Sequence, residues 1–139
     1  MLTLEDRFAV QDLLAEYVRA MDHAEVEAVV RLFTADGWVR DIQNRMWDAD
    51  AGGPRGFAER WLQPPLKKRG QHSIQHVRFE TPSTDEVQDY SYCQCLRRNP
   101  AETEAPVLGV IGTYRDVCVR QGGRWLIRSK TIDRWVSEA

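Results

Sequence analysis

Residues 3–21 read TLEDRFAVQDLLAEYVRAM, and apolar side chains recur through this stretch at helical spacing. They fall at i, i+3, i+4, i+7, i+8 and i+11, which is one stripe of a helix with 3.6 residues per turn. Thr3 opens the stretch and Asp6 follows three residues later, a pairing that resembles a capping box. The pattern predicts an amphipathic helix whose core-facing stripe consists of Val10, Leu13, Leu14, Tyr17, Val18 and Met21.

Two further helices are predicted before residue 70. One runs from about residue 24 to 33, and the Ala-Asp-Gly sequence at residues 35–37 supplies its stop. The other suits residues 54–66, where a proline pair at positions 64 and 65 ends it. Between them, residues 38–42 alternate as a short strand, and residues 48–54 are rich in Asp, Gly and Pro, which is typical of a loop.

The chain after residue 70 is strand-like. Turn-forming residues at 81–85, at Asn99-Pro100 and in the Gln121-Gly122-Gly123 hairpin separate the successive segments. Helices followed by a meander of strands predict an α+β domain whose helices cover one face of a bent sheet. The predicted strands are residues 72–79, 87–98, 107–120 and 124–136.

Composition limits the partners and the architecture. A chain of 139 residues is long enough to close one core and too short for two, so residues 1–139 are expected to form a single domain. A net charge of −2 provides no field that would attract nucleic acid or an anionic membrane. Since no apolar run approaches the roughly 18 residues of a membrane span, we expect a cytoplasmic protein without nucleic-acid or membrane partners.

The three cysteines are Cys93, Cys95 and Cys118, an odd number set in strand-like segments, whereas a secreted scaffold normally shows an even set. Cys93 and Cys95 lack the two-residue spacer of a redox or zinc motif, so buried free thiols are expected. The sequence also contains no phosphate-binding glycine loop, nucleophile elbow or string of metal ligands. We therefore expect a protein that uses neither a metal nor a cofactor.

His72 and His76 are candidates for chemistry because they lie four residues apart in a predicted strand. The two-residue period of a strand would place both imidazoles on one face, with Ile74 between them. Histidine titrates near neutrality and can act as a base without a cofactor. The alternative is that one or both only bond to a neighbouring strand or face solvent. Their backbones would be roughly 13 Å apart, too far to share a metal ion.

Asp22, Tyr17 and Trp38 are further candidates. Asp22 follows the helical stripe, where the helix dipole disfavours a carboxylate unless it finds a partner such as an imidazolium; the alternative is a solvated or capping residue. Tyr17 can direct its hydroxyl into a pocket, or it can simply pack in the core. The five tryptophans, Trp38 among them, either line a nonpolar ligand site or fill the core.

Five short motifs carry a family resemblance over nearly the whole chain. The sequence resembles the SnoaL-like group of the nuclear-transport-factor-2-like superfamily, and its pattern is similar to scytalone dehydratases and hexachlorocyclohexane dehydrochlorinases. The resemblance implies a cone, made of a strongly curved mixed or antiparallel sheet with about three N-terminal helices. The motifs are YVRAMD at residues 17–22, VVRLFTADG at 29–37, HSIQHVRFE at 72–80, GTY at 112–114 and GRW at 123–125.

The resemblance also implies a catalytic pair. In the resembled enzymes, an Asp at the end of the first helix orients a basic His on the strand after the third helix, and Asp22 and His72 match these positions. The chain departs from the pattern where family members often have Asn (His76) and where the dehydrochlorinase has Lys (Tyr17). Scytalone dehydratase has a second catalytic His on the next strand, where the nearby positions of this chain are Tyr92, Gln94 and Cys95. The proton donor is therefore open among Tyr17, His76 and Tyr92.

This resemblance implies a cofactor-independent lyase or isomerase, in which His72 removes a carbon-bound proton from a small apolar cyclic or polyketide-like substrate. Elimination of water is the favoured reaction. Isomerisation, ring closure and dehydrohalogenation begin with the same proton transfer and are alternative reactions. The alternative function is a non-catalytic ligand-binding or oligomerisation module of the same fold. A homodimer or homotrimer through the outer face of the sheet is also expected, because residues 107–119 include exposed apolar positions.

Overall fold

The computed structural model describes residues 1–63, 69–98 and 107–135 of the chain. Within these residues, the helices α1 (Leu4–Asp22), α2 (Val26–Arg31) and α3 (Gly53–Leu62) come early in the sequence, and the short 3-10 helix η1 (Ala49–Ala51) precedes α3. The strands are β1 (Phe33–Arg40), β2 (Met46–Trp47), β3 (Arg69–Ser83), β4 (Glu86–Arg98), β5 (Val107–Gln121) and β6 (Arg124–Arg134).

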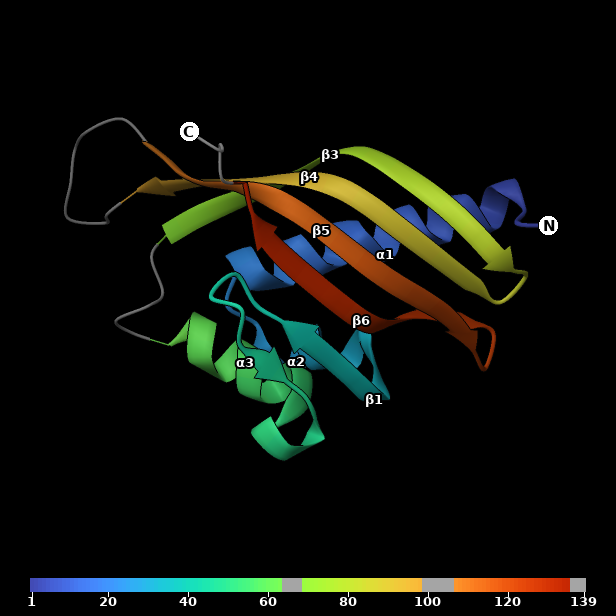
Figure 1. Ribbon diagram of the computed structural model, residues 1–139, viewed down its shortest axis with the longest axis horizontal. Helices are drawn as coiled ribbons and strands as arrows, with labels where there is room; N and C mark the ends of the chain where they lie inside the picture. The colour runs from blue at the N-terminus through green and yellow to red at the C-terminus, as the bar shows by residue number, and fades with distance from the viewer. Residues whose placement is uncertain (64–68, 99–106, 136–139) are drawn as a thin grey trace.

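The strands form one mixed sheet in the order β2-β1-β6-β5-β4-β3. The β1–β6 pair is parallel, and every other neighbouring pair is antiparallel. Figure 1 shows α1 running behind the long strands, with α2 and α3 beside β1. The sheet curls around α1 and stays open between its edge strands β2 and β3. The predicted α+β cone is thereby confirmed, and its inner face holds the core.

The N-terminal end of α1 is tied to the opposite end of the chain through Asp6. The predicted capping box is confirmed, because Thr3 Oγ1 accepts from the Asp6 amide at 3.1 Å and Asp6 accepts from the Thr3 amide at 3.1 Å. The Asp6 carboxylate also pairs with Arg120 at 2.9 Å and accepts the indole N–H of Trp125 at 3.2 Å. Contact with Arg120, then with Thr3, holds the pKa of Asp6 well below its usual value.

None of the helices that the structure describes is both long enough and apolar enough to cross a membrane.

The second helix is shorter than predicted. It ends at Arg31, and Phe33 starts β1 instead of completing the helix, because the Leu32 carbonyl accepts from the Ile127 amide at 2.8 Å. The predicted stop at residues 35–37 lies inside β1, where the pairing with β6 shifts register between Phe33 and Trp38. Gly37 fits this close approach, because an added Cβ would lie only 3.0 Å from the Thr34 carbonyl oxygen.

The turns were predicted more accurately than the strand ends. Gly122 and Gly123 both have positive φ, of 56° and 74°, which is the geometry of a two-residue type I′ hairpin. The 81–85 connection is shorter than predicted, because β3 continues through Ser83 and pairs it with Glu86. Pro82 is tolerated because β3 is an edge strand. The predicted boundaries at residues 64–66, 99–100 and 136 lie outside the described residues.

The outer face of the sheet carries an exposed aromatic cluster. Tyr90 and Tyr92 alternate along β4 with buried residues and are 39% and 41% exposed. Tyr92 packs edge-on against both Tyr90 and Trp135, at ring-centroid distances of 6.0 and 6.1 Å. Ile111, also exposed, lies on the adjacent strand. These side chains are the surface that the predicted homodimer or homotrimer would cover.

We expect light scattering coupled to size-exclusion chromatography to give two or three chain masses at micromolar concentration. Tyr92→Glu is expected to shift the population toward the monomer, since it introduces a charge into the aromatic cluster. A wild-type chain that elutes only at the monomer mass would contradict the self-association prediction.

Thr3→Ala is expected to lower the free energy of unfolding by about 1 kcal/mol, because it removes the side-chain acceptor of the N-cap. Thr3→Ser keeps the hydroxyl oxygen and serves as the matched control. Urea denaturation followed by circular dichroism measures both variants. Equal stabilities for the Ala and Ser variants would show that the capping bond contributes nothing.

Candidate active site

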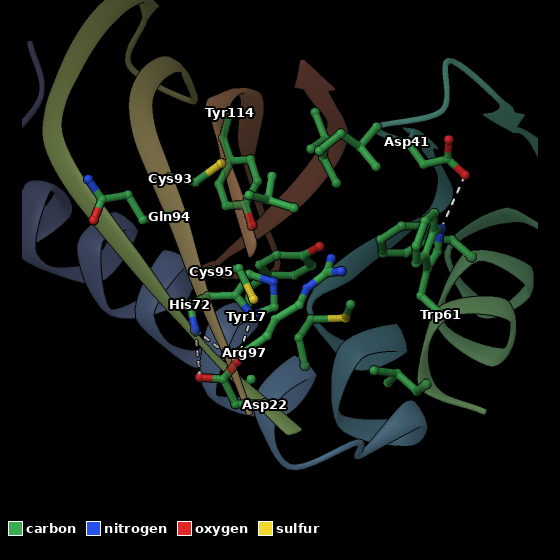
Figure 2. Close-up of a pocket in the computed structure, with 17 residues that line it drawn as sticks. Tyr17, Asp22, Asp41, Trp61, His72, Cys93, Gln94, Cys95, Arg97 and Tyr114 are labelled. Atoms are coloured by element: carbon green, nitrogen blue, oxygen red, sulfur yellow. Dashed lines mark hydrogen bonds and ion pairs between the residues drawn. The ribbon is translucent and has the colours of Figure 1, made fainter. Parts of the chain in front are cut away.

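A cavity of about 120 Å³ lies between the inner face of the sheet and the helices. Helix α1 contributes Tyr17, Met21 and Asp22, and α3 contributes Phe57, Trp61 and Leu62. The volume suits a ligand about the size of a small ring compound. Ionisable side chains on its wall, labelled in Figure 2, include Tyr17, Asp22, His72, Cys95, Arg97 and Tyr114.

Asp22 and His72 meet at the edge of this cavity. The His72 Nδ1 atom lies 2.6 Å from Asp22 Oδ1, and the carboxylate oxygens also accept from the His72 backbone N–H at 3.1 and 3.2 Å. The carboxylate at the C-terminal end of α1 thus finds donors from β3 that offset the unfavourable helix dipole. Both side chains are partly shielded, with 27% of His72 and 16% of Asp22 exposed.

The carboxylate defines which nitrogen of His72 is available for chemistry. A bond from Nδ1–H to Asp22 leaves the lone pair of the neutral ring on Nε2. Burial opposes the charged form, but the interactions with Cys95 and Asp22 outweigh it, so the pKa of His72 lies above its usual 6.5. A basic imidazole therefore lines the cavity.

Tyr17 and Tyr114 lie side by side on the cavity wall. Their ring centroids are 6.1 Å apart, and Tyr17 also packs edge-on against Phe33 at 6.3 Å. Burial, followed by nearby groups such as Asp116 and Cys93, raises the pKa of both phenols well above 10. Each hydroxyl therefore stays protonated and can donate a hydrogen bond.

Lys130 is fully buried behind the two tyrosine rings. Its ammonium lies 4.2 Å from the Tyr17 ring centroid and 3.9 Å from that of Tyr114, and it donates to Asp116 Oδ2 at 2.7 Å. The negative faces of the aromatic rings and the carboxylate together compensate for the loss of water around this cation. The ammonium thereby fixes the positions of both phenol rings.

A second carboxyl group, Asp89, lies directly opposite Asp116 across β4 and β5, and both are buried. One ammonium cannot neutralise two carboxylates in a dry interior. Burial, then the charge of Asp116, raises the pKa of Asp89 to about 8, so Asp89 is the carboxyl that stays protonated near neutrality. One oxygen of each carboxyl and the Ser91 hydroxyl have no partner among the described residues.

The prediction that His76 shares the face of His72 is wrong. His76 has a φ of 54°, and the β3–β4 pairing shifts register between Gln75 and Arg78. This bulge reverses the phase of the strand, so Val77 packs on the core while His76 is exposed. His76 instead packs edge-on against Tyr92 at 5.6 Å on the outer face. Neither His76 nor Tyr92 lines the cavity.

Trp38 also lies outside the cavity, and it lines a separate depression of the sheet together with Arg115 and Thr131. Trp61 takes the place predicted for an aromatic wall. Its indole N–H donates to Asp41 Oδ2 at 3.2 Å, and Trp47 donates to the same oxygen at 2.7 Å. Asp41 thereby joins β1 and β2 to α3 and stabilises this side of the cavity.

Sequence reasoning missed several of these residues for different reasons. Asp116 has the same strand phase as Tyr114 and Cys118, so a buried carboxylate could have been inferred from alternation. The burial of Lys130 could not have been inferred in this way, because the β5–β6 pairing shifts register between Val117 and Cys118 and brings Lys130 into the core. Strict alternation from Ile127 would have placed it outside.

In the described parts of the chain, no three His, Cys, Asp or Glu side chains come together as a metal-binding group. The absence of a cofactor stays a prediction.

Comparisons with known proteins agree with this architecture. A family model described as a SnoaL-like domain matches residues 2–131. A search of curated proteins finds no match.

Several solved structures share the fold. A putative scytalone dehydratase from Novosphingobium aromaticivorans is 18% identical, with a TM-score of 0.79, and the match covers 96% of this chain and 86% of that one. ActVI-ORFA from Streptomyces coelicolor is 23% identical, with a TM-score of 0.80 and coverage of 92% and 96%. LinA is 20% identical, with a TM-score of 0.76 and coverage of 93% and 85%. At these identities the similarity establishes the fold.

The raised pKa of Asp89 has a consequence for stability. The native carboxyl keeps its proton up to about pH 8, whereas the unfolded chain releases it near pH 3.8. The stabilising contribution is therefore complete below about pH 4 and is lost as the pH rises toward 8. Asp89→Asn cannot titrate, so the free energy of unfolding of this variant is expected to rise relative to that of wild type as the pH increases across this range, by roughly 1 kcal/mol per pH unit.

Urea denaturation of both proteins at pH 5, 6, 7 and 8 measures the difference. Asp12→Asn, on the exposed face of α1, is the control and should keep the wild-type pH dependence. Parallel pH profiles for Asp89→Asn and wild type would refute the protonated state of Asp89.

Proposed function

Because the chain belongs to the SnoaL-like domain family, we propose that it is a cofactor-independent lyase of the dehydratase type, or an isomerase, with His72 as general base. The observation that carries this proposal is the 2.6 Å contact between His72 Nδ1 and Asp22 at the cavity edge. It leaves Nε2 free to accept a proton from a carbon atom of a bound ligand.

The Asp22 carboxylate has two tasks in this mechanism. It holds the tautomer that carries the reactive lone pair on Nε2, and it stabilises the imidazolium that forms when His72 takes a proton. A carbon next to a carbonyl or in an activated ring is acidic enough for such a base. If the hydroxyl group on the adjacent carbon then leaves as water, with a proton from a donor in the cavity, the elimination is complete. If the proton returns to a different carbon, the product is an isomer.

The proton donor is drawn from the cavity wall. Of the three predicted candidates, Tyr17 alone lines the cavity, and Tyr114 joins it as a second neutral phenol. Because burial keeps both hydroxyl groups protonated, either can polarise a carbonyl or assist a leaving hydroxyl group. Lys130 is a positioning residue here, since its ammonium contacts the two rings from behind.

The proposed substrate is small, cyclic and largely apolar. Apolar side chains from every layer line the cavity, and they include Met21, Ile42, Phe57, Leu62, Val110 and Ile132. The putative scytalone dehydratase among the similar structures agrees with elimination of water. A non-catalytic binding module is the less favoured function, because it offers no reason for the partly buried imidazole to be paired with a carboxylate.

His72→Ala is expected to lower kcat/KM by about 10²–10⁴-fold, and Asp22→Asn by about 10–100-fold, on cyclic β-hydroxy ketones assayed by absorbance of the conjugated product. His76→Ala, a histidine of the same strand on the outer face, is the matched control and should retain wild-type turnover. Activity that survives both cavity substitutions undiminished would refute the dyad.

The pH profile provides a separate measurement. His72 must be neutral to act as a base, so kcat/KM is expected to rise with pH through a pKa above 6.5. Asp22→Asn removes a carboxylate that raises this pKa, so the acid limb should move to lower pH. An acid limb that does not move in Asp22→Asn would show that Asp22 does not tune the base.

A further inference from the structure

Cys95 lies directly opposite His72 in the pairing of β3 with β4, and both side chains line the cavity. Directly opposed residues on one face have Cβ atoms about 4.5–5.5 Å apart, so a thiol and an imidazole in these positions are within reach. Figure 2 shows Cys95, His72 and Asp22 together at the lower end of the cavity. Asp22 binds one nitrogen of the ring, and Nε2 is the nitrogen left for the thiol.

The surroundings of Cys95 favour its thiolate. Burial alone disfavours the anion, but the interactions with His72 and then with Arg97 outweigh it, so the pKa of Cys95 lies below its usual 9.0. The raised pKa of His72 has the same origin, since imidazolium and thiolate stabilise each other. The charged and titratable groups that line the cavity together with the thiol are His72 from β3, Arg97 and Cys93 from β4, Asp22 and Tyr17 from α1, Tyr114 from β5, and Asp41 directly after β1.

The other two cysteines provide an internal contrast. Cys93 lies two residues away on the same strand face, yet burial raises its pKa to about 11. Cys118 is fully buried, and burial, then the carboxyl groups of Asp116 and Asp89, raise its pKa well above 9. All three thiols are free and buried, but only Cys93 and Cys95 line the cavity, and of these two only Cys95 lies opposite a histidine that is itself held by a carboxylate.

We propose that Cys95 is a nucleophilic thiol, activated by His72 and Asp22, that adds covalently to small alkenes conjugated to a carbonyl when these enter the cavity. His72 takes the thiol proton, and the sulfur forms a bond to the β-carbon of the alkene. The π electrons move to give an enolate, and the imidazolium returns the proton to the α-carbon. No atom leaves and no oxidant is needed. This addition does not depend on the proposed lyase or isomerase activity.

The experiment treats the folded full-length chain with acrylamide, a small conjugated alkene, and follows adduct formation at each cysteine by peptide mass spectrometry. At pH 7 we expect Cys95 to react at least about tenfold faster than Cys93 and Cys118, since one pKa unit changes the thiolate fraction about tenfold. His72→Gln and Asp22→Asn are each expected to slow the reaction at Cys95 and to move its rate–pH curve to higher pH.

Cys118 reports on folding in the same experiment, because it reacts only when the core opens. If a variant exposes Cys118, the wild-type rate–pH curve decides alone: a midpoint below 9.0 at Cys95 supports the proposal, and a midpoint at or above 9.0 overturns it. The proposal is also overturned if Cys95 reacts no faster than Cys93, or if both folded variants retain the wild-type rate. His76→Ala is the matched control and should label as wild type does.

Discussion

The Asp22 carboxylate joins the C-terminal end of α1 to the edge strand β3, across 50 residues of sequence, through one side-chain and two backbone contacts of 2.6–3.2 Å. The remaining architecture depends on this tie. The C-terminal end of a helix normally repels an anion, and the edge of a sheet normally exposes unpaired N–H groups. The contacts between the Asp22 carboxylate and His72 give the anion donors and give the edge N–H an acceptor. It also brings the His72 ring to the edge of the cavity instead of to solvent.

Behind the cavity, the sheet contains charges that a simple hydrophobic core would exclude. Lys130 contacts Asp116 and two aromatic rings, while Asp89 keeps its proton because burial, and then the charge of Asp116, raise its pKa. Such a layer costs desolvation free energy, which the ion pair and the ring faces offset. Its structural effect is to hold the rings of Tyr17 and Tyr114 in place, while burial raises the pKa of both phenols and keeps their hydroxyl groups neutral.

One imidazole thus has two neighbours with different chemical consequences. Asp22 makes His72 a stronger base toward a ligand, which supports proton abstraction. Cys95 can transfer its thiol proton to the same ring, which supports a role for its thiolate as a nucleophile. Both follow from the cross-strand register of β3 and β4, because His72 and Cys95 are paired residues. A register shifted by one residue would have turned the thiol to the outer face.

The sequence by itself determined the main helices and long strands and their order, from the 3.6-residue stripe of α1, its capping box, the glycine pair of the β5–β6 hairpin and the alternation of the strands, but not β2, η1 or the start of β1. Such signals are local, since they depend on backbone geometry within a few residues. Residue type and position made Asp22 and His72 candidates, and the family resemblance added their pairing. Only the tertiary structure decided the positions of His76 and Lys130. Beta-bulges in β3 and in the β5–β6 pairing change the face of the sheet on which a side chain lies. A bulge arises from pairing with another strand, so the alternation of residues within one strand cannot reveal it.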